Sequence, residues 1–234
     1  DLTITSGADI LLSPTANVGI GNTVPGSLLE ISKVSGRASL ELSSWSATAT
    51  AAHAGVLIFQ KSGTATLNTF TGGDHTTAGE ILGRIEAYGV DDDDGSTLSS
   101  YIEFANDAVS DADSSPGKIV FATSDADDAG TPTVAMTIDD SQQVGIGTAS
   151  PAETLHLHAT NPMIRLNTTS GSGAAGINFT EGDAHRWSMG LKAGDDSFYI
   201  GEDAQYMYTN ARLTIAGDSS GDVTVNTGNL IVNT

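Results

Sequence analysis

The hydrophobic residues at the start of the chain follow a short and regular pattern. Apolar residues stand two positions apart in three runs that begin eight residues from one another: Leu2 and Ile4, Ile10 and Leu12, Val18 and Ile20. Such alternation is typical of a strand with one buried face. The segments between the runs contain Gly, Pro, Asn and Asp, which favour turns. The pattern therefore predicts a ladder of very short strands, which Leu29 and Ile31 continue.

This ladder recurs with a constant offset of 126 residues. Residues 18–31, Val-Gly-Ile-Gly-Asn-Thr-Val-Pro-Gly-Ser-Leu-Leu-Glu-Ile, align without gaps with 144–157, Val-Gly-Ile-Gly-Thr-Ala-Ser-Pro-Ala-Glu-Thr-Leu-His-Leu. The same offset aligns residues 10–12 with 136–138, and a gapless repeat indicates a repeated structural unit. Strands of this length bury only two side chains each, so the unit is too thin to be stable alone. It must stack on itself or share its apolar face with other chains.

The longer hydrophobic runs predict wider β modules. After the first copy we predict strands at 38–42, 55–60, 81–88, 100–104, 118–122 and 134–138. The last four alternate with acidic loops, an arrangement typical of an antiparallel meander. After the second copy we predict strands at 163–166, 176–179, 187–191, 197–200, 213–215, 222–225 and 229–232. No stretch has the period and caps of a helix, so the predicted fold class is all-β.

The alternation of thin and wide segments divides the chain into five parts. We predict slim shaft segments, β-prism-like or β-helix-like, at 1–31, 136–157 and 208–234. Between them we place a wider antiparallel module with acidic loops at 32–135 and a smaller β module at 158–207. The predicted architecture is therefore an elongated fibre.

The composition of the chain mainly excludes nucleic acids and membranes as partners. Acidic residues number 29 against 9 basic ones, which gives a formal net charge of −20. Because phosphate contacts need Lys and Arg, we expect no nucleic-acid binding. No apolar run approaches the ~20 residues of a membrane span, so we expect no membrane insertion. The chain has no Cys, which excludes disulfides and thiolate metal sites. It begins at Asp1 without Met, and we interpret it as part of a longer polypeptide.

Two patterns resemble functional motifs, but a structural explanation fits each of them better. Gly-Ile-Gly at 19–21 and 145–147 lacks the third Gly and the following helix of a dinucleotide-binding loop. His156 and His158 share one face of a strand, where three chains would gather six imidazoles for a transition metal. The flanking leucines, however, take the apolar face of that strand. We therefore expect structural glycines, solvated histidines and no cofactor or metal at these positions.

Acidic clusters at 91–94, 111–113 and 125–128 carry the oxygen ligands that Ca²⁺ prefers. None has the spacing of an EF hand, since a loop that opened at Asp125 would need Glu where Met136 stands. We interpret the clusters as solvated loops that favour solubility and leave Ca²⁺ binding open. Nothing singles out a pair of catalytic carboxylates among the 29 acids, and no Gly-x-Ser-x-Gly elbow exists. We expect no catalytic residues and no enzymatic activity.

Several segments together resemble a known family. Residues 144–151, Val-Gly-Ile-Gly-Thr-Ala-Ser-Pro, followed by Leu-His-Leu at 155–157, resemble a repeated element of bacteriophage tail fibres. In the first copy, Asn22 and Val24 stand where that element usually has Thr and Ser. Other segments resemble further parts of these fibres: 176–179 with 186–190 and 198–200, and the tail 227–232.

This resemblance implies a homotrimer, and the thin ladder is compatible with one. Three chains around a threefold axis would each offer a narrow apolar face to a shared interior. Burial there contributes about 25 cal/mol per Å² of apolar surface. A single-chain solenoid is the alternative, but it requires a steady period that the wider modules break. The predicted trimer core is Leu2, Ile4, Ile10, Leu12, Val18, Ile20, Leu29, Ile31, Met136, Ile138, Val144, Ile146, Leu155, Leu157, Val223, Val225, Leu230 and Val232.

The function that the resemblance implies is structural. The chain would be a segment of a tail fibre, located in the virion and outside the cell, that supports host recognition and attachment. Its expected partners are further copies of itself, other tail proteins, and a host surface glycan or protein contacted by loops or by a missing tip. Two alternatives remain: a trimeric adhesin or filament of a cell surface, and a tailspike glycan hydrolase.

Overall fold

The computed structural model describes residues 17–44, 54–61, 76–92, 95–111, 113–126, 131–169, 173–192, 194, 196–202, 211–217 and 221–226. Within these ranges the regular structure consists of thirteen β-strands and includes no helix. The predicted all-β class is confirmed. The described residues accordingly contain no helix that could cross a membrane.

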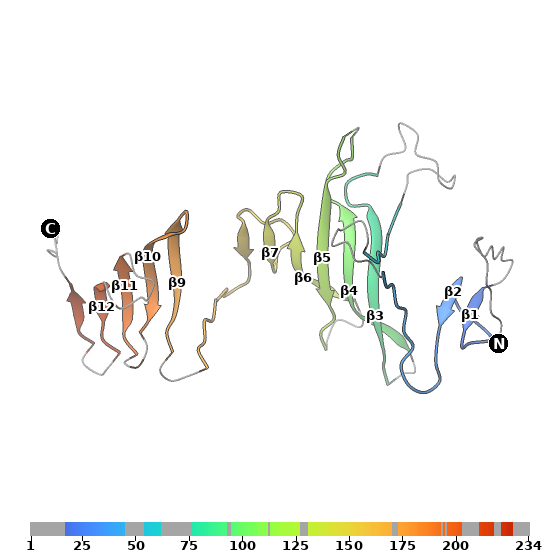
Figure 1. The fold of residues 1–234 in the computed structure, drawn as a ribbon, viewed down its shortest axis with the longest axis horizontal. Helices are drawn as coiled ribbons and strands as arrows, with labels where there is room; N and C mark the ends of the chain where they lie inside the picture. The colour runs from blue at the N-terminus through green and yellow to red at the C-terminus, as the bar shows by residue number, and fades with distance from the viewer. Residues whose placement is uncertain are drawn as a thin grey trace. The chain divides into compact units, whose positions relative to one another are not determined.

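The chain divides into two compact units, residues 1–156 and 157–234. The first unit contains a small sheet of two strands, β1 (Val18–Ile20) and β2 (Leu29–Ile31). It also contains nearly all of a six-stranded sheet, whose last strand reaches the boundary between the units. The second unit contains a five-stranded sheet (Figure 1). The predicted division into five parts stays a prediction.

The six-stranded sheet begins as an antiparallel meander, as the alternation of strands and acidic loops predicts. Its strands follow chain order: β3 (Ile81–Val90), β4 (Ser96–Asn106), β5 (Gly117–Thr123), β6 (Thr133–Ile138), β7 (Val144–Ile146) and β8 (Leu155–Leu157). Neighbours from β3 to β7 pair antiparallel. The second copy of the repeat, β7 with β8, therefore forms the last two strands of this sheet (Figure 1).

Large apolar side chains of this sheet lie on one face. Residues directly opposite each other in paired strands share a face, so the register defines two rows across five strands. One row is Ile85, Ile102, Phe121, Met136 and Ile146. The other row is Gly83, Phe104, Ile119, Ile138 and Val144.

The opposite face of the six-stranded sheet carries small, charged and aromatic side chains. Val120 and Thr137 lie there and are buried. Arg84 and Glu103 also lie there as a pair, with 2.6 Å between Arg84 Nε and Glu103 Oε2. The Arg84 guanidinium lies 4.3 Å from the centre of the Tyr101 ring. The bond to Glu103, its main electrostatic partner, raises the pKa of Arg84.

A buried polar cluster closes the end of β4. Asn106 is fully buried, and its side-chain amide donates to Thr76 Oγ1 at 2.6 Å and to Ser110 Oγ at 2.7 Å. Its backbone N–H donates to the carbonyl of Glu80, and its carbonyl accepts from the N–H of Gly79. Asn106 therefore ties the segment before β3 to the loop after β4.

The five-stranded sheet is a second antiparallel meander. Its strands are β9 (Ala175–Glu181), β10 (Ala184–Leu191), β11 (Phe198–Glu202), β12 (Ala211–Ile215) and β13 (Val223–Val225). They lie in chain order across the sheet (Figure 1). All five coincide with predicted strands to within a few residues.

Three predicted strands are wrong. Residues 38–42, 55–60 and 163–166 belong to no strand, although their apolar and polar residues alternate or cluster as strands do. A strand requires a hydrogen-bonded partner as well as a suitable sequence, and these segments join none of the three sheets. Most of their large apolar side chains are exposed. The predicted strands at 2–4, 10–12 and 229–232 lie outside the described residues.

Candidate subunit interface

The repeat element folds as two short strands joined by a tight connection. β1 and β2 pair in parallel, with Val18 opposite Leu29 and Ile20 opposite Ile31. Parallel strands usually need a crossover of about a dozen residues or more, yet only residues 21–28 separate this pair. The connection must therefore turn sharply at each end.

The two copies of the repeat have the same backbone. The N–H of Val18 donates to the carbonyl of Leu28 at 2.8 Å, and the N–H of Val144 donates to the carbonyl of Thr154 at 2.9 Å. Gly21 and Gly147 both have positive φ, 79° and 75°, which L side chains rarely adopt. The strand bounds also differ by 126 residues. The sequence repeat is thus a structural repeat.

Different side chains make equivalent hydrogen bonds in the two connections. Asn22 Oδ1 accepts from the N–H of Val24 at 3.0 Å. In the second copy, Thr148 Oγ1 accepts from the N–H of Ser150 at 3.2 Å. Asn and Thr side chains both close such local turns by accepting from the backbone two residues on. The replacement of Thr by Asn in the first copy therefore preserves the turn.

Glu30, which lies in β2, holds the connection between β1 and β2 in place. Its Oε2 accepts from the N–H of Gly26 at 2.8 Å, and its Oε1 accepts from the amide of Asn22 at 2.7 Å. The Gly26 N–H is the main reason that the pKa of Glu30 lies below its ordinary value of 4.5, and the Asn22 amide adds to the effect. These donors favour the charged carboxylate.

The first glycine of each Gly-Ile-Gly motif allows a close backbone approach. A Cβ on Gly145 would lie 2.5 Å from the carbonyl oxygen of Thr148, and one on Gly19 would meet Asn22 even more closely. A strand, β2 or β8, follows each motif where a dinucleotide loop would need a helix. The first glycine of the motif therefore serves the turn.

The repeat strands leave much of their apolar surface uncovered in the single chain. Ile20 and Leu29 are 53% and 57% exposed, and their counterparts Ile146 and Leu155 are 44% and 54% exposed. Val223 and Val225 in β13 are also exposed. The half-buried members of the predicted trimer core are Val18, Ile31, Met136, Ile138, Val144 and Leu157.

The remaining members of the predicted core lie outside the described residues: Leu2, Ile4, Ile10, Leu12, Leu230 and Val232. The sequence analysis also missed the apolar rows of the six-stranded sheet, in which Ile85 is half exposed. The alternation of apolar and polar residues does identify these segments as strands with one apolar face. Only the strand register shows that they join the repeat residues Val144 and Ile146 on one continuous face.

His156 in β8 and His158 just after it occupy different environments. Leu155 is exposed and His156 is half-buried, so the predicted apolar and solvated sides are not cleanly separated. His156 Nδ1 accepts from the N–H of Ala152 at 3.3 Å, whereas His158 is exposed. Among the described residues, no group of three or more His, Asp or Glu side chains is placed to hold a metal ion.

The acidic loops use several of their carboxylates to close their own turns. Asp111 Oδ1 accepts from the N–H of Asp113 at 2.9 Å and from both the N–H and the hydroxyl of Ser114. The Asp113 N–H and then the Ser114 groups hold the pKa of Asp111 below its ordinary value of 3.8. Asp91 accepts from the Gly95 N–H in the same way. Asp93, Asp94, Asp127 and Asp128 lie outside the described residues.

One hollow of about 310 Å³ lies in the second unit, beside the edge of its sheet. Its lining combines hydroxyl, amide and charged groups with the apolar side chain of Leu191. The polar lining residues are Asn167, Thr168, Thr169, Lys192 and Asp196.

Comparisons with known proteins give only distant structural likenesses. No family model and no curated protein matches the chain. A solved structure of the carboxy-terminal domain of the bacteriophage T5 L-shaped tail fibre, with its intramolecular chaperone domain, is similar with a TM-score of 0.41 and 12% identity. The likeness covers 82% of this chain and 64% of that one. A structure of the same T5 domain, described without the chaperone, gives a TM-score of 0.35 and 13% identity over 82% and 93% of the two chains.

Proposed function

We propose that this chain is a structural segment of a bacteriophage tail fibre, in which three copies associate and support attachment to the host. The observation that carries the proposal is the exposure of the repeat residues. Ile20 and Ile146 occupy equivalent positions 126 residues apart, and each is about half exposed in the single chain. Apolar side chains repeated at such positions are stabilised when neighbouring chains cover them.

The resemblance of residues 144–157 to the repeated element of tail fibres supports the same assignment. The turn geometry explains why that element needs its glycines and its acceptor side chains. In the proposed fibre, the turns hold short strands in a fixed register along the predicted shaft, and the meanders form its predicted wider modules. The role is mechanical, and the proposed location is the virion, in contact with other tail proteins.

Contact with the host is the finer part of the proposal. The polar hollow beside Leu191 offers hydroxyl, amide and charged groups within about 310 Å³, a combination that suits a sugar unit of a surface glycan. The acidic loops are the other exposed candidates. Glycan binding by the purified chain, and its loss in Asn167→Ala with Thr168→Ala, would test the hollow.

A charge placed in the repeat tests the association. Asp in place of Ile146 puts a carboxylate at a position that is 44% exposed in one chain, so the single chain should tolerate it. In an interface the same carboxylate would be buried without a partner. Ile146→Asp should therefore lower the mass of the particle, whereas Ala149→Asp, in the exposed turn nearby, should not. Equal masses for both variants would contradict the proposal.

The two alternatives make different predictions. A trimeric cell-surface adhesin would bury the same apolar residues between its chains. In that case, however, an antibody against the chain would label the cell envelope and leave the tails of virions unlabelled. A tailspike hydrolase would depolymerise a host glycan when the purified chain is added. Structural function in the fibre predicts tail labelling and no depolymerisation.

A further inference from the structure

One face of the five-stranded sheet is apolar across its whole width. The register places one row of five side chains, one from each strand, on this face: Ile177, Met189, Ile200, Leu213 and Val225. A second row lies beside it: Ala175, Leu191, Phe198, Ile215 and Val223. Phe179 and Trp187 extend the same face on β9 and β10. We name these residues the second-sheet apolar face.

The side chains of the second-sheet apolar face remain accessible in the single chain. Seven of them are 38–62% exposed, and Phe179 and Trp187 are among these. The other face of the sheet carries polar side chains, among them Asn178, Ser188 and Thr214. Ser188 is buried there, as is Tyr199. The large apolar residues therefore lie on the less covered face of the sheet. In a sheet that is stable within one chain, the apolar face packs on the core and the polar face meets solvent.

We propose that the second-sheet apolar face packs against a second copy of this chain. This inference rests on the proposed function and deepens it, because it places a meander, and not only the short repeat strands, at the contact between chains. The sequence analysis assigned only Val223 and Val225 of this face to the trimer core.

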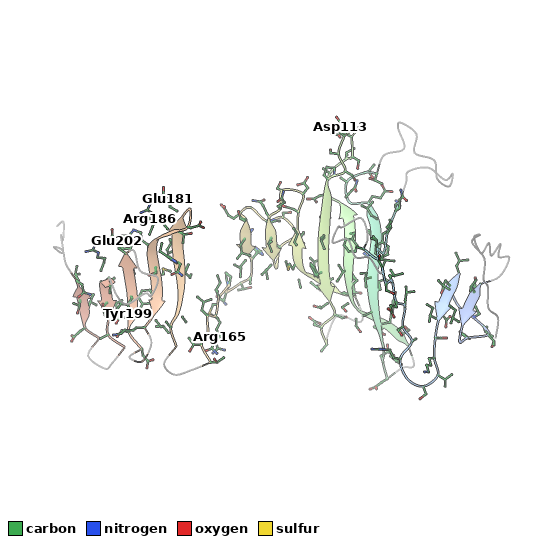
Figure 2. All side chains as sticks on the ribbon, viewed as in Figure 1. Asp113, Arg165, Glu181, Arg186, Tyr199 and Glu202 are labelled. Atoms are coloured by element: carbon green, nitrogen blue, oxygen red, sulfur yellow. The ribbon has the colours of Figure 1, made fainter. Side chains whose placement is uncertain are left out.

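The distribution of charge favours an identical copy as the occupant. Arg186 Nε lies 3.1 Å from Glu181 Oε2, and Arg212 Nη2 lies 2.5 Å from Glu202 Oε2. Glu181, Arg186 and Glu202 gather at one end of the strands, while Tyr199 lies further along them (Figure 2). The register places Glu181 and Glu202 at the end of this same face, and their pairing with arginines of the same chain removes the repulsion that they would exert on an identical copy. A copy related by rotation presents such a surface automatically.

The area of the face also suits association between copies. With strands ~4.8 Å apart and alternate residues ~7 Å apart along each strand, the face covers roughly 400–500 Å². The largest apolar patch on a typical monomer is about 300–600 Å². Each partner in a stable interface contributes ~800 Å². The face alone therefore supplies about half of what one partner contributes, which suits a contact that adds to the proposed association of the repeat strands.

The absence of Cys from the chain makes a direct test possible, since any cross-link through one introduced thiol must join two chains. Ile177→Cys and Asn178→Cys place the thiol on adjacent residues of β9 that point to opposite faces. Both side chains are exposed in the single chain. In the native particle, Ile177→Cys should react with a water-soluble maleimide at least tenfold more slowly than Asn178→Cys. Each rate is expressed relative to the rate measured for the same variant in denaturant.

Cross-linking identifies what covers the face. Ile177→Cys, Ile200→Cys and Val223→Cys span its width, and a bis-maleimide should join two chains through at least one of them. Asn178→Cys should give no such product. Should Ile177→Cys fail to fold, as judged by circular dichroism, Leu191→Cys replaces it on the same face.

The outcomes separate this inference from the proposed function. A particle of several chains in which the Ile177→Cys thiol reacts as fast as that of Asn178→Cys would leave the fibre assignment intact and overturn the sheet contact. A protected face without any cross-link between chains would mean that the chain covers itself, which also overturns the contact. A particle of one chain would overturn both.

Discussion

Glu30 and His156 occupy equivalent positions in the two copies of the repeat and close equivalent turns. The carboxylate of Glu30 accepts from the N–H of Gly26 at 2.8 Å, and Nδ1 of His156 accepts from the N–H of Ala152 at 3.3 Å. The pairs are offset by 126 residues, as is the rest of the repeat. Both copies thus place an acceptor at this position, a carboxylate in the first and an imidazole in the second.

Acid should weaken the first turn through Glu30. The pKa of Glu30 lies below 4.5 in the folded chain, chiefly because the Gly26 N–H favours the carboxylate. A lowered folded pKa means a stabilising contribution that is fully present above 4.5 and is lost as the pH falls through the folded value. We expect Glu30→Gln to reduce this part of the acid sensitivity in thermal unfolding, and Glu41→Gln, at an exposed position, to leave it unchanged. Identical pH profiles for wild type and Glu30→Gln would contradict this role.

The close approach at Gly145 predicts a strong effect of a single methyl group. A Cβ there would lie 2.5 Å from the Thr148 carbonyl oxygen, so the turn has to move. We expect Gly145→Ala to lower the free energy of unfolding by about 1–3 kcal/mol in a urea titration. Gly117→Ala is the control, because its nearest neighbour would lie at 3.9 Å. Equal losses in both variants would show that the approach at Gly145 does not limit the turn.

Asn106 should be the most sensitive polar residue of the six-stranded sheet. It is fully buried and donates to both Thr76 and Ser110. Asn106→Ala leaves those hydroxyls without their donor, at a cost of about 1–3 kcal/mol in the free energy of unfolding. Asn161→Ala, at an exposed position, should change it by less than about 0.5 kcal/mol. A loss at Asn106 no larger than that at Asn161 would rule out a stabilising network.

The pair formed by Arg84 and Glu103 should show coupling. Both side chains are largely covered, with side-chain exposures of 31% and 12%. Arg84→Leu alone leaves Glu103 without its cation, so we expect a loss of about 1–2 kcal/mol after allowance for solvent screening. Adding Glu103→Leu should recover part of that loss in a double-mutant cycle. Additive losses would mean that the two residues stabilise the sheet independently.

Much of the fold could be predicted from the sequence, because its strands are marked by alternation and its turns by Gly and Pro. The strands at residues 81–88 and 187–191 are examples. Segments such as 55–60 show the limit, since alternation reports a suitable residue pattern and not the presence of a partner strand. The parallel pairing of β1 with β2 was equally invisible, because hydrogen-bond direction leaves no mark on the pattern.

The candidate interface could be predicted only in part. The repeat residues stand out because an offset of 126 aligns them. The rows through Ile177 and Leu191 arise when five strands come into register, and the spacing within one strand does not reveal them. The equivalence of Glu30 and His156 was hidden for a chemical reason: the position conserves acceptor capacity, while charge and side-chain type change.

The central claim is that copies of the chain must cover the apolar side chains of the repeat. The mass of the native particle across a dilution series tests it most directly. Three chains of 23.9 kDa predict a particle of about 72 kDa that persists on dilution. A folded particle of 23.9 kDa in which the side chains of Ile20 and Ile146 are shielded from solvent would contradict the claim.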